Sequence, residues 1–93
     1  MTTITQIESR WEVAGNILMD SANSLLEKSK DLSLSVDTII DLSQVAEIDT
    51  SAVSLMLEWQ RRAMTENKQL KFENLPEGLT SLTALYGIAE LIN

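Results

Sequence analysis

The stretch "IIDLSQVAEIDTSAVSLMLEWQ", residues 39–60, changes character at Asp49. Its first part has a continuous apolar centre and β-branched residues, which is typical of a strand buried on both faces. After Asp49 the apolar residues recur with helical spacing. This stripe consists of Ala52, Leu55, Met56, Trp59 and Ala63. The stretch therefore predicts a short strand over "TIIDLS", residues 38–43, and a helix over residues 49–66.

The residues before this stretch predict two strands and a helix. Apolar and polar residues alternate weakly over residues 3–9, and residues 10–18 continue as a strand. The two segments could therefore pair as an antiparallel hairpin. Gly15 interrupts the second strand, as a turn or bulge would. Residues 19–30 carry a helical stripe, and either Asp20 or Ser21 can cap that helix with a side-chain oxygen.

The residues after the stretch predict one more strand and one more helix. The strand lies around Leu70 and Phe72, and Pro76 suits the first turn of the helix. Its apolar face consists of Leu79, Leu82 and Tyr86, and Gly87 suits its end. The resulting order is β-β-α-β-α-β-α in a single domain, residues 1–93. Alternating strands and helices predict an α/β fold with parallel strands joined by crossover helices.

Composition excludes several classes of function. The net charge is −7, with seven Lys and Arg, and the longest basic cluster is Arg61-Arg62. Nucleic acid and anionic lipid are therefore not expected partners, whereas a basic protein surface is weakly favoured. No apolar run approaches the roughly 20 residues that span a bilayer. The N-terminus resembles no signal peptide, so we expect a cytoplasmic protein without direct membrane insertion.

Residues for catalysis and metal binding are almost absent. Without His and Cys, a Ser-His-Asp or Cys-His arrangement is impossible. Asp41 and Asp49 form the one conceivable carboxylate pair, but acids at the ends of a strand-to-helix connection are usually solvated or capping. We therefore expect no enzyme, no cofactor, no metal and no small-molecule ligand.

The triplet Asp49-Thr50-Ser51 has two compatible interpretations. In the first it is a helix cap, since Asp is a favoured N-cap and Thr and Ser fit the first turn. In the second it is a functional site, because it lies at the carboxyl end of a strand and the amino end of a helix, where α/β sheets bind ligands. A phosphate there would also meet the positive end of the helix dipole.

The chain resembles a STAS domain along nearly its whole length. "VAGNI", residues 13–17, is similar to the V-x-G-x-[LI] segment of that family. "IIDLSQVAEIDTSAVSLML" is similar to its strand, its D-[LM]-[ST]-x-V-x-x-[IV]-D-[ST]-[SG]-G loop and the start of its helix. The resemblance implies a STAS-type sandwich with a small mixed sheet, helices and a short C-terminus.

One branch of the family comprises anti-sigma factor antagonists, in which a serine of the D-S-S-G loop is phosphorylated. Ser51 matches that serine and Thr50 the hydroxyl before it, so the resemblance implies Ser51 or Thr50 as a possible phosphoacceptor. Ala52 stands where the family usually has Gly. The sequence therefore departs from the family pattern in the backbone segment that faces the kinase.

A second branch is more similar, namely the small STAS subunit of Mla-type phospholipid-transport ABC systems of Gram-negative bacteria. The chain is short, has Asp-Thr at the loop and ends in "TALYGIAELIN". This resemblance implies an accessory subunit on the cytoplasmic ATPase, peripheral to the inner membrane, that supports the maintenance of outer-membrane lipid asymmetry. Thr50 would match the threonine that is important at that contact.

The expected contact surface is the loop of residues 47–52 with the exposed part of the following helix. The candidate partner-binding residues are Asp49, Thr50, Ser51, Ala52, Val53 and Leu57. For Val53 and Leu57, packing at the edge of the core is an equally good interpretation. Trp59 is expected in the core, whereas Trp11 is expected on an edge strand and partly exposed.

Overall fold

The computed structural model describes residues 2–85, which fold into four strands and three helices. In chain order these are β1 (Thr3–Ile7), β2 (Arg10–Ile17), α1 (Met19–Ser29), β3 (Asp37–Ile48), α2 (Thr50–Thr65), β4 (Gln69–Glu73) and α3 (Glu77–Leu85). The expected order of elements is confirmed. Tyr86 and Gly87, which we expected in the last helix, lie outside the described residues.

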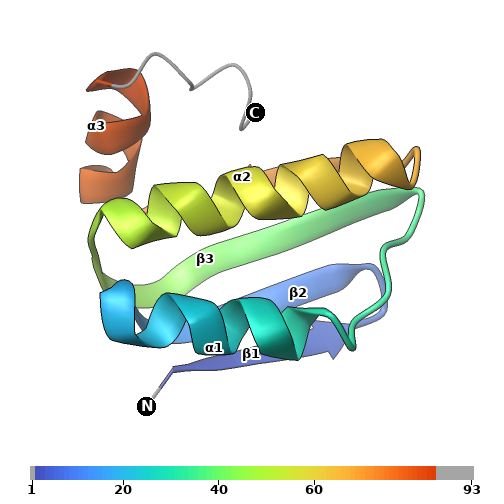
Figure 1. Ribbon diagram of the computed structural model, residues 1–93, viewed down its shortest axis with the longest axis horizontal. Coiled ribbons are helices and arrows are strands. Elements are labelled where there is room, and N and C mark those ends of the chain that lie inside the picture. The colour runs from blue at the N-terminus through green and yellow to red at the C-terminus, as the bar shows by residue number, and fades with distance from the viewer. Residues whose placement is uncertain (1, 86–93) are drawn as a thin grey trace.

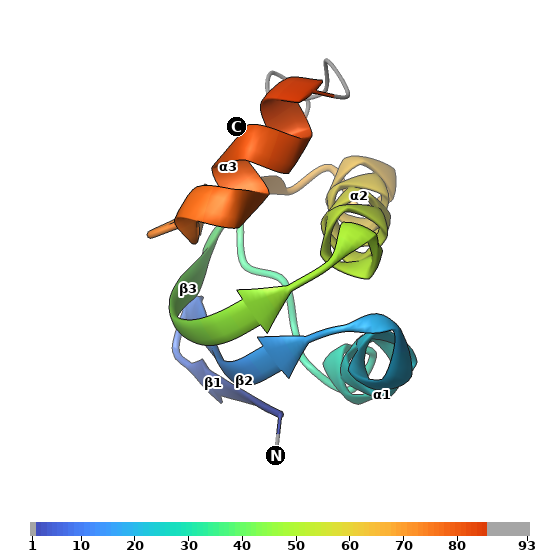
Figure 2. The same ribbon diagram turned by 90° about the vertical axis from the view of Figure 1, so that its left-hand side faces the viewer.

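The strands form one mixed sheet in the order β1-β2-β3-β4. The β1–β2 hairpin is antiparallel, and β3 is parallel to both β2 and β4. Both parallel connections pass through a helix, and right-handed crossovers place such helices on the same face. Accordingly, α1 and α2 lie side by side on one face of the sheet and run in the same direction (Figures 1 and 2).

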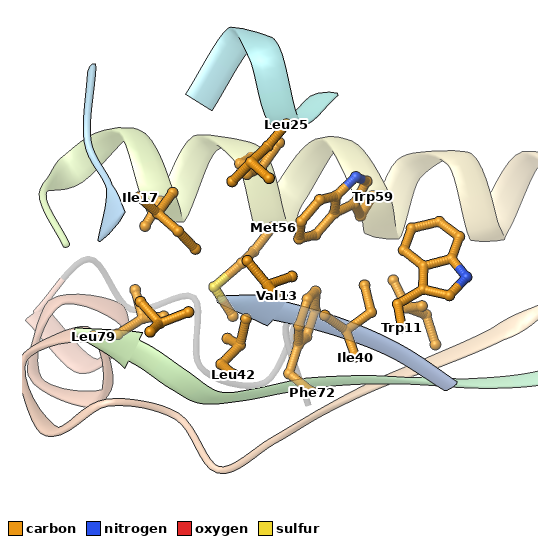
Figure 3. Packing of buried hydrophobic residues seen from close by; sticks show 14 of the residues in the cluster. Trp11, Val13, Ile17, Leu25, Ile40, Leu42, Met56, Trp59, Phe72 and Leu79 are labelled. Atoms are coloured by element: carbon orange, nitrogen blue, oxygen red, sulfur yellow. The ribbon is translucent and has the colours of Figure 1, made fainter. Parts of the chain in front are cut away.

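The core lies between the sheet and these two helices (Figure 3), and three aromatic side chains pack together in it. The rings of Trp11 and Trp59 meet edge to face with centroids 6.0 Å apart, and Trp59 stacks on Phe72 at 6.4 Å. The prediction for Trp59 is confirmed. The prediction for Trp11 is wrong: its side chain is 0% exposed, because β2 is an inner strand paired with both β1 and β3.

Two local expectations also need correction. Strand β3 extends to Ile48, five residues beyond the predicted end, because pairing with β2 continues past Gln44. Helix α1 starts after Leu18, so neither Asp20 nor Ser21 is its N-cap. Instead the Ser21 hydroxyl accepts a hydrogen bond from the Leu18 backbone N–H. The expected irregularity at Gly15 is confirmed, with a positive φ and a shifted register.

Arg62 joins the C-terminal ends of α1 and α2. Its guanidinium donates hydrogen bonds to the backbone carbonyls of Ser29 and Leu32, and it pairs with Glu66 at 2.9 Å. The same group lies over the Trp11 ring, 5.7 Å from its centroid. A cation at helix C-termini satisfies carbonyls that have no partner within the helix. Arg62 therefore fixes the position of α1 relative to α2.

Candidate functional site

The candidate site begins with Asp49, which caps α2 as expected. Its backbone is extended, and its Oδ1 accepts a hydrogen bond of 2.8 Å from the Ser51 backbone N–H. This contact satisfies one of the amides in the first turn that have no partner within the helix. The cap therefore depends on two residues, Asp49 and Ser51, that lie two positions apart in the sequence.

Asp49 also holds the start of the neighbouring helix. Its Oδ2 accepts a hydrogen bond of 2.9 Å from the backbone N–H of Met19, the first residue of α1. Burial tends to raise the pKa of Asp49, but the hydrogen bonds from Ser51 and Met19 outweigh it and lower the pKa below the usual value. One ionised carboxylate therefore serves two helix N-termini, where the helix dipoles favour negative charge.

The structure separates the candidate residues of the first turn of α2. Thr50 is exposed and Ser51 is half-buried. In contrast, Ala52 is fully buried and Val53 is only 5% exposed, and both belong to the core. At Val53 the packing interpretation holds, and Ala52 also packs in the core, so the candidate side chains that remain accessible at this end of the helix are those of Asp49, Thr50 and Ser51.

Leu57 lies two turns further along α2 and is half-buried. With the exposed residues Thr50, Ser54 and Arg61 it forms a stripe at spacings i, i+4, i+7 and i+11, which places all four on the outer face of the helix. Leu57 also lines a surface hollow of about 490 Å³ together with Gln60, Arg61, Met64 and Thr65. The outer face of α2 therefore extends from Thr50, in the loop of residues 47–52, to Leu57 and Arg61.

A second hollow lies on the other flank of this stripe, between α1 and α2. It has a volume of about 210 Å³, and we call it the N-terminal groove. Its lining residues are Met19, Ala22, Asn23, Ser51, Ser54, Leu55 and Glu58. Met19 is the apolar residue most exposed here, at 78%. Ser51 thus faces a different surface from Leu57.

Met19 is a site residue that the sequence analysis missed. Its contact with Asp49 joins residues 30 positions apart, so no local pattern reveals it. Asn16 was missed for the same reason: its side-chain oxygen accepts a hydrogen bond from the Glu47 backbone N–H at the end of β3. The one available signal was a methionine directly after the predicted strand of residues 10–18.

Asp41, the other acid of the possible catalytic pair, lies on the sheet face opposite α1 and α2. Arg10 donates to its Oδ2 at 2.7 Å, and Asn74 and the Ser43 backbone N–H donate to its Oδ1. Burial tends to raise the pKa of Asp41, but these hydrogen bonds lower it far below the usual range. An acid held ionised in this way cannot donate a proton near neutral pH, so Asp41 is not suited to act as a general acid.

Two features are absent from the described residues, 2–85. None of the helices there is long and apolar enough to cross a membrane. Within the same range, no group of three or more His, Cys, Asp or Glu is arranged to hold a metal ion. The candidate site consists of Asp49, the outer face of α2 and the two hollows beside that face.

Comparisons with solved structures agree with this architecture. The chain superimposes on a sulfate transporter family protein from Wolinella succinogenes with a TM-score of 0.73 and 17% identity, covering 91% of this chain and 70% of that one. It superimposes on the unphosphorylated anti-sigma factor antagonist SpoIIAA with a TM-score of 0.65 and 10% identity, covering 91% and 83%. Such identities show a shared fold. A search of the curated proteins finds no match.

A family model also matches the chain. The model is described as "Mlab, STAS domain", and it matches residues 1–93. STAS domains are generally noncatalytic domains that regulate or bind other proteins, including in transporters. The match covers the strand, the Asp49 cap and the helix from which the site is built. The chain belongs to the STAS domain family.

Proposed function

We propose that this chain is a noncatalytic accessory subunit of an Mla-type phospholipid-transport ABC transporter. It binds the ATPase on the cytoplasmic side of the inner membrane and supports its assembly and activity, and so supports outer-membrane lipid asymmetry. The chain itself binds no lipid. The observation that carries the proposal is the match of the whole chain to a family model whose description names Mlab.

The geometry of the site supports a docking role. Thr50 is exposed at the start of α2, and its stripe continues through Ser54 to Leu57. Asp49 accepts one hydrogen bond from the Ser51 amide of this turn and one from the Met19 amide of α1, so the turn is held in place before a partner arrives. Such preorganisation lowers the ordering cost of association. One helix face that carries the exposed hydroxyl of Thr50 and the half-buried side chain of Leu57 suits a protein partner.

The test is co-purification of the full chain with the ABC ATPase from the same genome. We expect a stable complex with the wild-type chain, and Thr50→Arg to abolish or strongly weaken it. A long cation on the outer face of α2 would prevent close packing and require desolvation of its charge. Loss of the complex should also lower the ATPase activity of the assembled transporter.

Thr5→Arg is the matched control, because Thr5 is an exposed threonine on edge strand β1. It adds the same side chain and charge away from α2, so binding should be retained. Failure of the wild-type chain to form a complex would remove the proposal. If a complex forms and both arginine variants bind as the wild type does, the ATPase contacts another surface.

The alternative is an anti-sigma factor antagonist controlled by phosphorylation at Ser51. The observation in its favour is that Ser51 lines the open N-terminal groove, with Thr50 exposed beside it. Incubation with a cognate kinase and ATP, followed by mass spectrometry, distinguishes the two functions. Phosphorylation of Ser51 or Thr50 would favour the anti-sigma factor antagonist. An unmodified chain, in conditions where a control antagonist is phosphorylated, would eliminate it.

A further inference from the structure

The two edge strands of the sheet have the same length but differ in charge. Within residues 2–85, β1 pairs only with β2 and β4 pairs only with β3, and each edge strand has five residues. β4 exposes the side chains of Lys71 and Glu73, and charged side chains on an edge strand discourage pairing with another chain. β1 has the sequence TITQI, without a charged residue or a proline. The edge at β1 therefore lacks the protection that β4 has.

The backbone of β1 is free to pair on its outer side. Figure 2 shows β1 at one margin of the sheet, with α1 and α2 on a face of the sheet rather than along that margin. In the described part of the chain, the β1 backbone bonds only to β2. The pair Ile7–Arg10 closes the two-residue hairpin and is hydrogen-bonded, and bonded pairs alternate along the ladder. The N–H and C=O groups of Ile4 and Gln6 therefore point away from β2.

The strand is already ordered, and its outer side chains are uncharged. Because side chains alternate along a strand, Thr3, Thr5 and Ile7 share the sheet face opposite the helices, and all three are exposed. On the helix face, the Gln6 side-chain amide accepts a hydrogen bond from the Ser33 N–H and donates one to the Ser33 carbonyl. These contacts tie β1 to the segment between α1 and β3. An edge that is fixed in this way loses little conformational freedom when it pairs.

We propose that β1 pairs in the antiparallel direction with β1 of a second copy of this chain, so that two four-stranded sheets join into one about a twofold axis. In the register centred on Thr5, Ile4 lies opposite Gln6 of the second copy. This register lets the outward backbone groups of both strands bond to each other. Thr5 then faces Thr5 of the second copy, and Thr3 faces its Ile7. All of these cross-strand pairs are uncharged, so none is repulsive.

A second copy fits this edge because the pairing is self-complementary and closed. A twofold axis makes both strands use the same surface, and the joined sheet ends on both sides in β4, with Lys71 and Glu73 exposed. Two effects keep the association weak. The net charge of −7 opposes it, and five paired residues bury less than the roughly 1,200 Å² of a stable interface. We expect a dissociation constant on the order of 100 μM to 1 mM.

Cysteine cross-linking tests the register. The chain has no Cys, so Thr5→Cys introduces a single thiol. In the proposed dimer the two Cα atoms at this position face each other in a non-hydrogen-bonded pair, about 4.5 Å apart, which a disulfide can bridge. Thr3→Cys is the matched control, because it is exposed on the same face of the same strand. Its own copy would lie four residues further along, roughly 14 Å away.

Under mild oxidation we expect Thr5→Cys to form disulfide-linked dimers at least about tenfold faster than Thr3→Cys, since only the first pair lies within reach of a disulfide. A non-reducing gel measures both rates. Equal rates would indicate random collision. Faster linking of Thr3→Cys would indicate a different register, and either outcome would overturn the proposal.

The association itself is tested with the wild-type chain. Sedimentation equilibrium should show a reversible monomer–dimer equilibrium, and the amide signals of Ile4 and Gln6 should shift with protein concentration in NMR spectra. Thr5→Arg places two cations opposite each other and should leave the chain monomeric. Gln69→Arg makes the same change in net charge on the exposed side of β4 and should still dimerise.

The proposal is wrong if the wild-type chain is monomeric at about 1 mM, or if both arginine variants dimerise equally. It is also wrong if the Ile4 and Gln6 amides shift only when the ATPase is added, because β1 would then take a strand of that protein. This inference does not depend on the proposed function. Thr5→Arg should lose the dimer and retain ATPase binding, so the two proposals can fail separately.

Discussion

The two ends of the α1–α2 pair are built on the same electrostatic rule with opposite signs. At the C-terminal end, the cation Arg62 donates to the carbonyls of Ser29 and Leu32. At the N-terminal end, the anion Asp49 accepts from the amides of Met19 and Ser51. In both cases one side chain joins two helices. Asp49 satisfies amides that helix N-termini leave without partners within the helix, and Arg62, in the last turn of α2, reaches the carbonyl at the end of α1 and a carbonyl of the segment that follows it.

The difference between the ends is what surrounds that side chain. Arg62 lies against Trp11 and is 26% exposed, so its end of the pair is closed by packing. Asp49 has exposed neighbours, Met19 and Thr50, and an open groove beside it. A closed end contributes mainly stability, whereas an ordered but uncovered end is suited to binding. The following variants test that division.

Arg62→Met should have the largest effect on stability. It removes charged donors from two carbonyls and the cation above Trp11, and we expect a loss of about 2–3 kcal/mol in the free energy of unfolding. Chemical denaturation measures this loss. Arg61→Met is the matched control: Arg61 is 74% exposed and contacts Glu58, so its loss should be below about 0.5 kcal/mol. Equal effects would show that Arg62 does not join the helices.

Trp59→Phe should have the next largest effect. The Trp59 indole N–H donates to the Ser29 hydroxyl at 2.8 Å, and that hydroxyl donates to the Leu26 carbonyl. Loss of the buried hydrogen bond should cost about 1–2 kcal/mol. Ser29→Ala should cost a similar amount, and the double variant less than their sum, because they share one contact. Strict additivity in denaturation experiments would contradict a shared contact.

Asp49→Ala should lower stability less than Arg62→Met but should impair partner binding more. It removes the acceptor for the first turns of two helices, so the amides of Met19 and Ser51 should exchange with solvent faster. Asp49→Asn keeps a capping side chain and should retain most of the protection. Hydrogen exchange followed by NMR measures both variants. Unchanged exchange in Asp49→Ala would mean that the cap does not order this end.

Acid should weaken the Asp49 end selectively. The pKa of Asp49 in the folded chain lies below its ordinary value of 3.8, so the folded state binds fewer protons there than the unfolded state. Its stabilising effect is therefore present above about pH 4 and is lost as the pH falls through the lower, folded-state pKa. NMR titration should show the Met19 and Ser51 amides shifting there, ahead of the Trp59 indole signal. Asp49→Asn should abolish that shift.

Much of the site followed from local patterns in the sequence. Asp49 lies two residues from the amide that it caps, and the stripe ending at Ala63 has a helical period, so both were predictable. Trp11 was not, because its burial depends on β2 lying between β1 and β3. The length of β3 was missed for the same reason, since pairing with β2 extends it beyond its apolar centre.

By itself, the sequence determined the strand, cap and helix of residues 39–60, because hydrophobic period and capping act between residues close in the chain. Tertiary structure alone decided that Asp49 also holds Met19 and that Arg62 closes the opposite end of the helix pair. These contacts join residues about 30 positions apart, and parallel strands joined by helices bring them together.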